Sequence, residues 1–186
     1  MLGFFSERLA NATPEMVDAL GETTKTFREL EKSPDRVAAI VGGAMLDQQL
    51  QDALIRRFCY SKGTQKLFFE GAASETNAKI QLAYLLQIIS EEARDNLVAI
   101  NTIRNRFTQR LSIRSFDHKD LAAVFMDITF YRRLKERTQL TDSMAFEPVP
   151  DNAKRRDRFI ATVTYLHALL TLDPFQEKPV PVKPHF

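Results

Sequence analysis

The sequence predicts an all-α protein, folded as a single-domain helical bundle of about six or seven helices. Two observations support this prediction. Glycine is scarce, with 6 in 186 residues, and 4 of the 8 prolines fall after residue 173, so turn signals are too sparse for a β-rich chain. Apolar residues elsewhere recur at helical spacing. We expect one all-helical domain at 1–172, followed by an extended Pro-rich tail at 173–186.

Composition narrows the class of protein. Apolar residues make up 44% and charged residues 27% of the chain, as in soluble globular proteins. The net charge is only +2, whereas a dedicated nucleic-acid binder usually carries a dense cluster of positive charges. The single cysteine, Cys59, rules out an internal disulfide and suits a reducing compartment. No secretory signal and no apolar run of about 20 residues is visible, so we expect a cytoplasmic protein without membrane contact.

The first helical pattern covers residues 13–32. Thr13 is its candidate N-cap, Pro14 takes the first helical position, and Gly21 is a candidate break between two short helices. The pattern restarts at Ser33, the predicted N-cap of the next helix.

The second pattern covers residues 33–60, and Asp35 complements the dipole of this helix. Its predicted apolar stripe consists of Val37, Ile40, Val41, Ala44, Leu50, Leu54 and Phe58. Gly42 and Gly43 lie mid-helix, where each costs about 1 kcal/mol relative to alanine. They indicate close approach of another helix; a hinge is the alternative.

The middle of the chain predicts a helical hairpin. Residues 61–74 form a connector with about one helical turn. Residues 77–89 are apolar nearly all round, which predicts a central, buried helix. Ser90 then caps a new helix at 91–109, with two acidic residues in its first turn.

The last third predicts two further helices. Asp117 with Asp120 opens the first, which runs through 121–128 and then either continues or restarts as a basic, exposed segment at 130–140. Residues 141–152 form a loop. The last helix covers 153–172 and carries an inner face of Phe159 or Ile160, Val163, Leu166 and Leu170.

The helix at 91–109 carries the most informative polar residues. On a helical wheel its core stripe consists of Ala93, Leu97, Ile100, Ile103 and Phe107. Arg104 falls inside this stripe, whereas Asn105 and Gln109 point to the other side. A buried guanidinium needs a carboxylate, carbonyl oxygens or a bound anion. The candidate carboxylate partners of Arg104 are Glu75, Asp117 and Asp120.

Four stretches, taken in order, resemble the bacterial mannitol operon repressor family, which is all-α and similar to HEPN-type helical domains. They are "AKIQLAYLLQIIS", "IRNRF", "SFD" and "RFIATVTYLHALL", and the resemblance spans residues 37–170. The residues that match the family pattern are Lys79, Ile80, Leu82, Ala83, Tyr84, Ile103, Arg104, Asn105, Phe107, Phe116 and Asp117.

The sequence departs from the family pattern at two places. The family's Ala-His after "IRN-F" is replaced by Thr108 and Gln109, and its glycine before "-IS" is replaced by Gln87. In HEPN ribonucleases the arginine and histidine cooperate, normally across a dimer, to cleave RNA. Cleavage needs a group that exchanges a proton near neutral pH, which an amide does not do. His118, nine residues past Gln109, is the only nearby histidine.

These observations define a candidate site without catalytic residues, cofactor or metal. His118, His167 and His185 lie on separate elements, so a three-histidine metal site is excluded. The family-motif residues, which either build the fold or bind an anion or partner, are Arg104, Asn105, Phe107, Gln109, Arg110, Phe116 and Asp117.

Two functions remain open. The resemblance implies transcriptional repression, yet no helix-turn-helix is evident, so we expect a non-enzymatic co-repressor or adaptor that binds a protein partner. The alternative is a degenerate HEPN-like module that binds RNA or a toxin partner without cleavage, with a homodimer expected. Basic runs at 104–114, 132–137 and 154–158 support direct nucleic-acid binding only weakly, because interleaved acids are typical of solvated helix faces.

Overall fold

A computed structural model describes residues 21, 25, 27–58, 62–135, 150 and 152–172. Over these residues the chain is helical and contains no strand, and residues 27–32 form the end of an earlier helix. Cys59, the tail at 173–186, and most of the predicted 13–32 helix and 141–152 loop lie outside the described residues. The helices are α3 (Asp35–Arg57), α4 (Lys62–Phe69), α5 (Thr76–Leu85), α6 (Glu91–Gln109) and α8 (Arg155–Leu172), with 3₁₀ turns η1 (Lys119–Leu121), η2 (Val124–Met126) and η3 (Phe130–Lys135).

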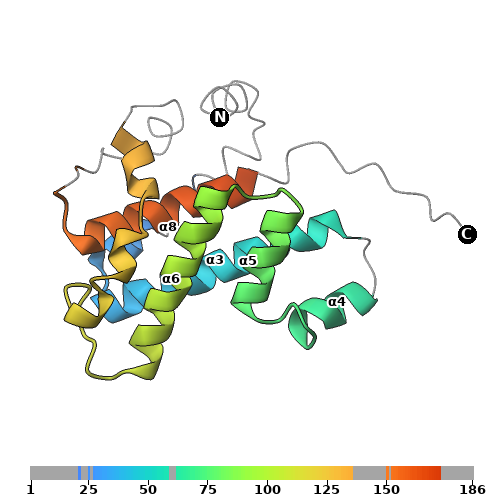
Figure 1. Ribbon diagram of the computed structural model, residues 1–186, viewed down its shortest axis with the longest axis horizontal. Coiled ribbons are helices and arrows are strands. Elements are labelled where there is room, and N and C mark those ends of the chain that lie inside the picture. The colour runs from blue at the N-terminus through green and yellow to red at the C-terminus, as the bar shows by residue number, and fades with distance from the viewer. Residues whose placement is uncertain are drawn as a thin grey trace, which may run out of the picture.

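α3 is the centre of the bundle. It contacts α4, α5, α6 and α8, and α6 lies across it beside α5 (Figure 1). The turn η1 lies at the C-terminal end of α6, whereas η2 and η3 lie along α6 and η3 also contacts α8 (Figure 1). Apolar side chains from these elements form one continuous buried core. The prediction of a single all-α bundle is therefore confirmed for the described chain.

The buried face of α3 differs from the predicted stripe. Val37, Val41 and Ala44 are exposed, so the prediction is wrong for the first half of the helix. Small residues face the neighbouring helices there, and hydrophobicity alone does not reveal them. The buried residues of α3 are Ala38, Ala39, Gly42, Gly43, Leu46, Leu50, Gln51, Ala53 and Leu54.

The two glycines of α3 admit two different helices. A Cβ atom at residue 42 would lie 3.3 Å from Val163 Cγ1 on α8. A Cβ atom at residue 43 would lie 2.7 Å from Arg104 Cδ on α6. The prediction that Gly42 and Gly43 allow close helix approach is therefore confirmed.

The start of α3 corrects the predicted cap. Pro34 takes the N-cap position without a side-chain hydrogen bond. The Ser33 hydroxyl instead donates to the Leu30 carbonyl oxygen at 2.8 Å and so closes the preceding helical segment. The predicted role of Ser33 as the cap of this helix is therefore wrong.

The connector at 61–74 contains more helix than predicted. Residues Lys62–Phe69 form α4, an eight-residue helix of about two turns. Its Phe68 is buried and packs edge-on against Phe58 at the end of α3, with ring centroids 5.6 Å apart. This aromatic contact provides the tertiary packing that a short helix needs.

α5 is shorter and less buried than the predicted central helix. It ends at Leu85, which is 72% exposed, and its buried residues are Lys79, Ile80 and Ala83. The apolar run is distributed between this edge helix and the turn that follows it, where Ile88 and Ile89 are buried. The prediction of a central, buried helix at 77–89 is therefore wrong.

Gln87 ends α5 in a left-handed conformation, with φ 57°. Its backbone N–H donates to the Tyr84 carbonyl at 3.0 Å, and that of Ile88 donates to the Ala83 carbonyl at 2.9 Å. These paired bonds form the helix-ending motif that usually has glycine at the left-handed position.

The predicted hairpin and the helices on either side of the core are confirmed. The Ser90 hydroxyl accepts a hydrogen bond from Ala93 N at 3.2 Å, which caps α6, and α5 packs against α6. All five residues predicted for the α6 stripe are buried, namely Ala93, Leu97, Ile100, Ile103 and Phe107. The predicted inner face of α8 is buried too, at Phe159, Ile160, Val163, Leu166 and Leu170.

The helix predicted from Asp117 onward is replaced by three 3₁₀ turns, so that prediction is wrong. Asp117 is exposed, and His118 occupies the N-cap of η1. Further on, the buried amide of Asn96 on α6 accepts hydrogen bonds from Thr129 N at 2.8 Å and Phe130 N at 3.1 Å. Because the N–H groups of Thr129 and Phe130 donate to this side chain, they are not available for the hydrogen bonds of a continuous α-helix.

Candidate functional site

The candidate site lies at the C-terminal end of α6 and in the loop that follows it. Phe107 and Phe116 are almost fully buried, and their rings pack edge-on with centroids 5.2 Å apart. Phe116 also contacts Phe125 and Phe159, at 5.9 and 4.8 Å between centroids. Both motif phenylalanines are therefore part of the core and unavailable to a ligand.

Arg36 on α3 binds one carbonyl oxygen in the last turn of α6 and three more in the loop that follows. Its guanidinium donates to Phe107 O and, at 3.1, 3.2 and 2.7 Å, to Arg110 O, Leu111 O and Ile113 O. An arginine at a helix C-terminus also complements the helix dipole. Arg36 therefore fixes the backbone path of the loop after α6.

A second arginine holds the loop from the other side. Arg156 on α8 donates to Asp35, and to the carbonyl oxygens of Leu30 at 3.1 Å and Glu31 at 2.9 Å. The other carboxylate oxygen of Asp35 accepts a hydrogen bond from Phe116 N at 2.9 Å. The loop is thus tied to the starts of both α3 and α8.

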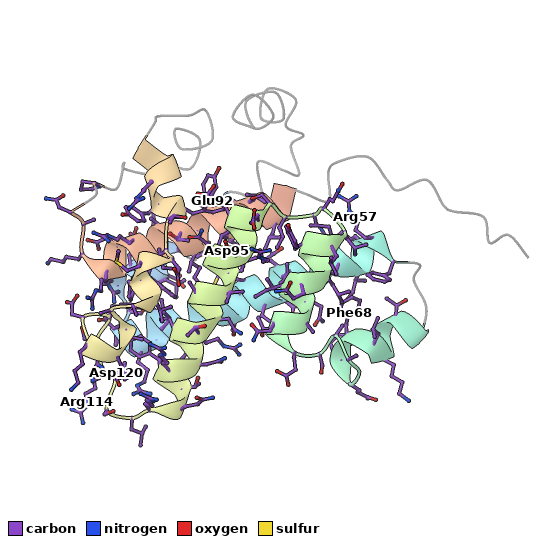
Figure 2. The ribbon with its side chains drawn as sticks, in the orientation of Figure 1. Arg57, Phe68, Glu92, Asp95, Arg114 and Asp120 are labelled. Carbon is purple, nitrogen blue, oxygen red and sulfur yellow. The ribbon has the colours of Figure 1, made fainter. Side chains whose placement is uncertain are left out.

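The polar motif residues at this end have structural or solvent-facing positions. Arg110 Nη1 lies 2.9 Å from Asp120 Oδ2, and Arg106 donates to the carbonyl of the same aspartate. His118 Nδ1 accepts a hydrogen bond from Asp120 N at 3.2 Å. Gln109 and Asp117 are exposed. Figure 2 shows Asp120 at this end of the bundle.

Arg104 is different. It is half-buried, and its aliphatic stem lies against Gly43 of α3. Within 27–58, 62–135 and 152–172, no hydrogen bond or ion pair engages its guanidinium, nor the half-buried amide of Asn105. The predicted pairing of Arg104 with Glu75, Asp117 or Asp120 is therefore wrong.

Buried polar pairs connect α6, α5 and α3 near Arg104. Lys79, which is only 3% exposed, places its ammonium 3.0 Å from both carboxylate oxygens of Asp47. On α6, Asn101 donates to the Asn77 side chain at 3.0 Å. Lys79 is one of the residues that carry the resemblance, and its role here is a structural ion pair between helices.

A surface cavity of about 970 Å³ lies beside the first half of α6. Sequence reasoning missed it, because it forms only where α6 meets the chain between η2 and η3. The acidic pair that starts α6 is the one signal of it in the sequence. We call this cavity the acidic groove; its lining residues are Ser90, Glu91, Glu92, Asp95, Asn96, Val98, Ala99, Thr102, Val124, Met126, Asp127 and Thr129.

No protein-family model matches the sequence, and no match is found among curated proteins or among solved structures. Within the described chain no helix is long and apolar enough to span a membrane. The same residues contain no group of three or more His, Cys, Asp or Glu side chains that could hold a metal ion.

Proposed function

We propose that this chain is a non-enzymatic regulatory protein that resembles the mannitol operon repressor family and acts as a cytoplasmic co-repressor or adaptor through a protein partner. The observation that carries the proposal is the use of the motif residues in the fold. Phe107 and Phe116 pack in the core, and Arg110 is paired with Asp120. The two phenylalanine rings are therefore not free to bind substrate.

The absence of a proton-transfer group at position 109 supports a non-enzymatic role. Gln109 is exposed and carries an amide, which neither gives nor takes a proton near neutral pH. His118 accepts a backbone hydrogen bond at the start of η1. Neither residue forms a general acid/base pair with Arg104.

The end of α5 supports the family resemblance on independent grounds. The family's glycine corresponds to Gln87, and this residue has φ 57° in a helix-ending motif. Glycine adopts such a conformation at the lowest cost. This backbone geometry favours the glycine that the family pattern has at this position.

The alternative function is a degenerate HEPN-like module that binds RNA or a toxin partner. Arg104 is the observation that favours it, because its guanidinium is half-buried and engages no carboxylate among the described residues. A phosphate oxygen would provide the partner that the arginine lacks.

Fluorescence anisotropy with labelled single-stranded RNA and duplex DNA, each at two salt concentrations, separates the two functions. The co-repressor proposal predicts no specific binding to either polymer. Salt-dependent RNA binding that Arg104→Ala abolishes would replace it with the RNA-binding alternative. Arg114→Ala is the matched control, because Arg114 is an exposed arginine just beyond α6. Its loss should affect only non-specific attraction.

A further inference from the structure

The acidic groove combines negative charge with an apolar floor. Carboxylates of Glu91, Glu92, Asp95 and Asp127 line it, and Figure 2 shows Glu92 and Asp95 on the first half of α6. Arg94 partly neutralises two of them, with its guanidinium 3.1 Å from Glu91 and 2.8 Å from Asp95. Even with Glu92 left aside, the described lining residues include three carboxylates, and Arg94 pairs with two of them, so this part of the groove keeps a negative potential.

Methionine and valine provide the apolar part of the groove. Met126 is 78% exposed and Val98 37% exposed, and both line the cavity together with Ala99 and Val124. An exposed methionine adapts its shape to an incoming apolar side chain. The groove therefore suits a segment that presents an apolar side chain flanked by cations.

The loop after α6 has this complementary chemistry. Leu111 is 81% exposed, and Arg110, Arg114 and Lys119 nearby are exposed cations, of which Arg110 pairs with Asp120. We call these residues, Arg110, Leu111, Arg114 and Lys119, the basic knob.

The backbone of the basic knob is held in place before any partner arrives. Arg36 donates to the carbonyl oxygens of Arg110, Leu111 and Ile113. A rigid loop that exposes a leucine loses little conformational entropy on binding. The exposed leucine is thus preorganised for docking.

We propose that the basic knob of one molecule docks in the acidic groove of a second copy of this chain. One molecule cannot satisfy both surfaces itself. Asp95 and Arg110 are 15 residues apart on and at the end of α6, which is about 22 Å along the axis. In Figure 2, Glu92 and Asp95 lie at one end of this helix and Arg114 beyond the other.

Such a contact is heterologous, because two different surfaces of the same chain meet. A dimer with one such contact keeps an unused groove on one molecule and an unused knob on the other, so association continues with concentration unless a ring closes. The contact is independent of the co-repressor proposal, since it requires neither nucleic acid nor a different protein partner.

Sedimentation velocity of the full chain over a concentration range, on the order of micromolar to millimolar, tests the contact. The knob variant carries Leu111→Ser and Arg114→Glu, and the groove variant carries Met126→Ser and Asp127→Lys. We expect the mass of the wild-type protein to rise with concentration. For each variant alone, the dissociation constant of self-association should rise by about tenfold or more. The reason is that every contact between two copies of the same variant lacks one intact surface.

Mixing the two variants gives the decisive result. The groove of the knob variant and the knob of the groove variant are intact, so the mixture should form 1:1 dimers that do not grow further. Phe69→Ser is the matched control: it removes an exposed apolar side chain on α4, a helix that packs on α3 and contributes no residue to either surface, and should leave association unchanged. Thermal unfolding of each variant verifies that it is folded.

Three results would overturn the proposal: a wild-type protein that stays monomeric throughout the range, variants that associate like the wild type, or a mixture that stays monomeric. Binding of RNA or DNA in the anisotropy experiment does not depend on whether the protein self-associates. Failure of this contact is therefore distinguishable from failure of the co-repressor proposal.

Discussion

The substitution Gly43→Ala tests the closest helix contact in the bundle. The added methyl group would lie 2.7 Å from Arg104 Cδ, 3.0 Å from Arg104 Cβ and 3.1 Å from Arg104 Cγ. Rotation of the arginine side chain moves its Cγ and Cδ but not its Cβ, which is attached to the α6 backbone. Helices α3 and α6 must therefore separate by a few tenths of an ångström.

The expected magnitude follows from two opposing effects. Overpacking of this kind costs about 1–3 kcal/mol, whereas alanine in mid-helix gains about 1 kcal/mol over glycine. We expect a net destabilisation of about 1 kcal/mol. Gly42→Ala has the same helix-propensity gain, but its methyl group would lie 3.3 Å from the Val163 methyl. We therefore expect Gly42→Ala to be roughly neutral, which makes it the matched control.

Urea unfolding followed by circular dichroism measures both substitutions. Combining Gly43→Ala with Arg104→Ala removes the two atoms at 2.7 and 3.1 Å, so the cost of Gly43→Ala should fall by about 1 kcal/mol in that background. A stabilising Gly43→Ala, or one equal to Gly42→Ala, would refute the close-contact reasoning.

Three further predictions concern the polar and strained groups of the bundle. Asp47→Asn should destabilise by about 2–3 kcal/mol in urea unfolding, because it leaves the buried Lys79 ammonium without a carboxylate; Lys79→Met should cost less. Gln87→Gly should raise the midpoint of thermal unfolding by about 2–4 °C, because it relieves a positive φ, and an unchanged midpoint would contradict this. Burial lowers the pKa of His167 to about 4. Between about pH 6.5 and pH 4 the unfolded chain therefore binds a proton at this histidine and the folded chain does not. The free energy of unfolding should be highest above about pH 6.5 and fall by up to about 3 kcal/mol as the pH is lowered to about 4. His167→Leu should abolish this slope.

The sequence predicts the fold well where a helix is amphipathic and capped locally. Ser90 and the apolar stripe of α6 specify that helix from its own residues. Which face of α3 is buried depends instead on the small residues that contact its neighbours. Gly42 and Gly43 indicate that face correctly, whereas the apolar residues Val37 and Val41 are exposed. Apolar content alone does not distinguish an edge helix from a central one, as α5 demonstrates.

The candidate site is harder to predict because its contacts join distant parts of the chain. Arg36 binds Phe107 across 71 residues of sequence, and Arg156 binds Ser33 across 123. No local period indicates such pairs. The turns after Asp117 depend in the same way on the amide of Asn96, which lies on another helix. The acidic groove forms only when α6 and the chain from η2 to Thr129 have both folded, because residues of both line it.

We propose that α6 performs no RNA chemistry, since Ile103 and Phe107 of its motif are buried in the core and Gln109 carries no proton-transfer group; this is the central proposal for the chain. Its most direct test is a time course of labelled single-stranded RNA with the wild-type protein and with Arg104→Ala, followed on a denaturing gel. We predict intact RNA with both proteins, because Gln109 cannot exchange a proton near neutral pH. Cleavage by the wild-type protein that disappears with Arg104→Ala would contradict the account and make this chain a ribonuclease.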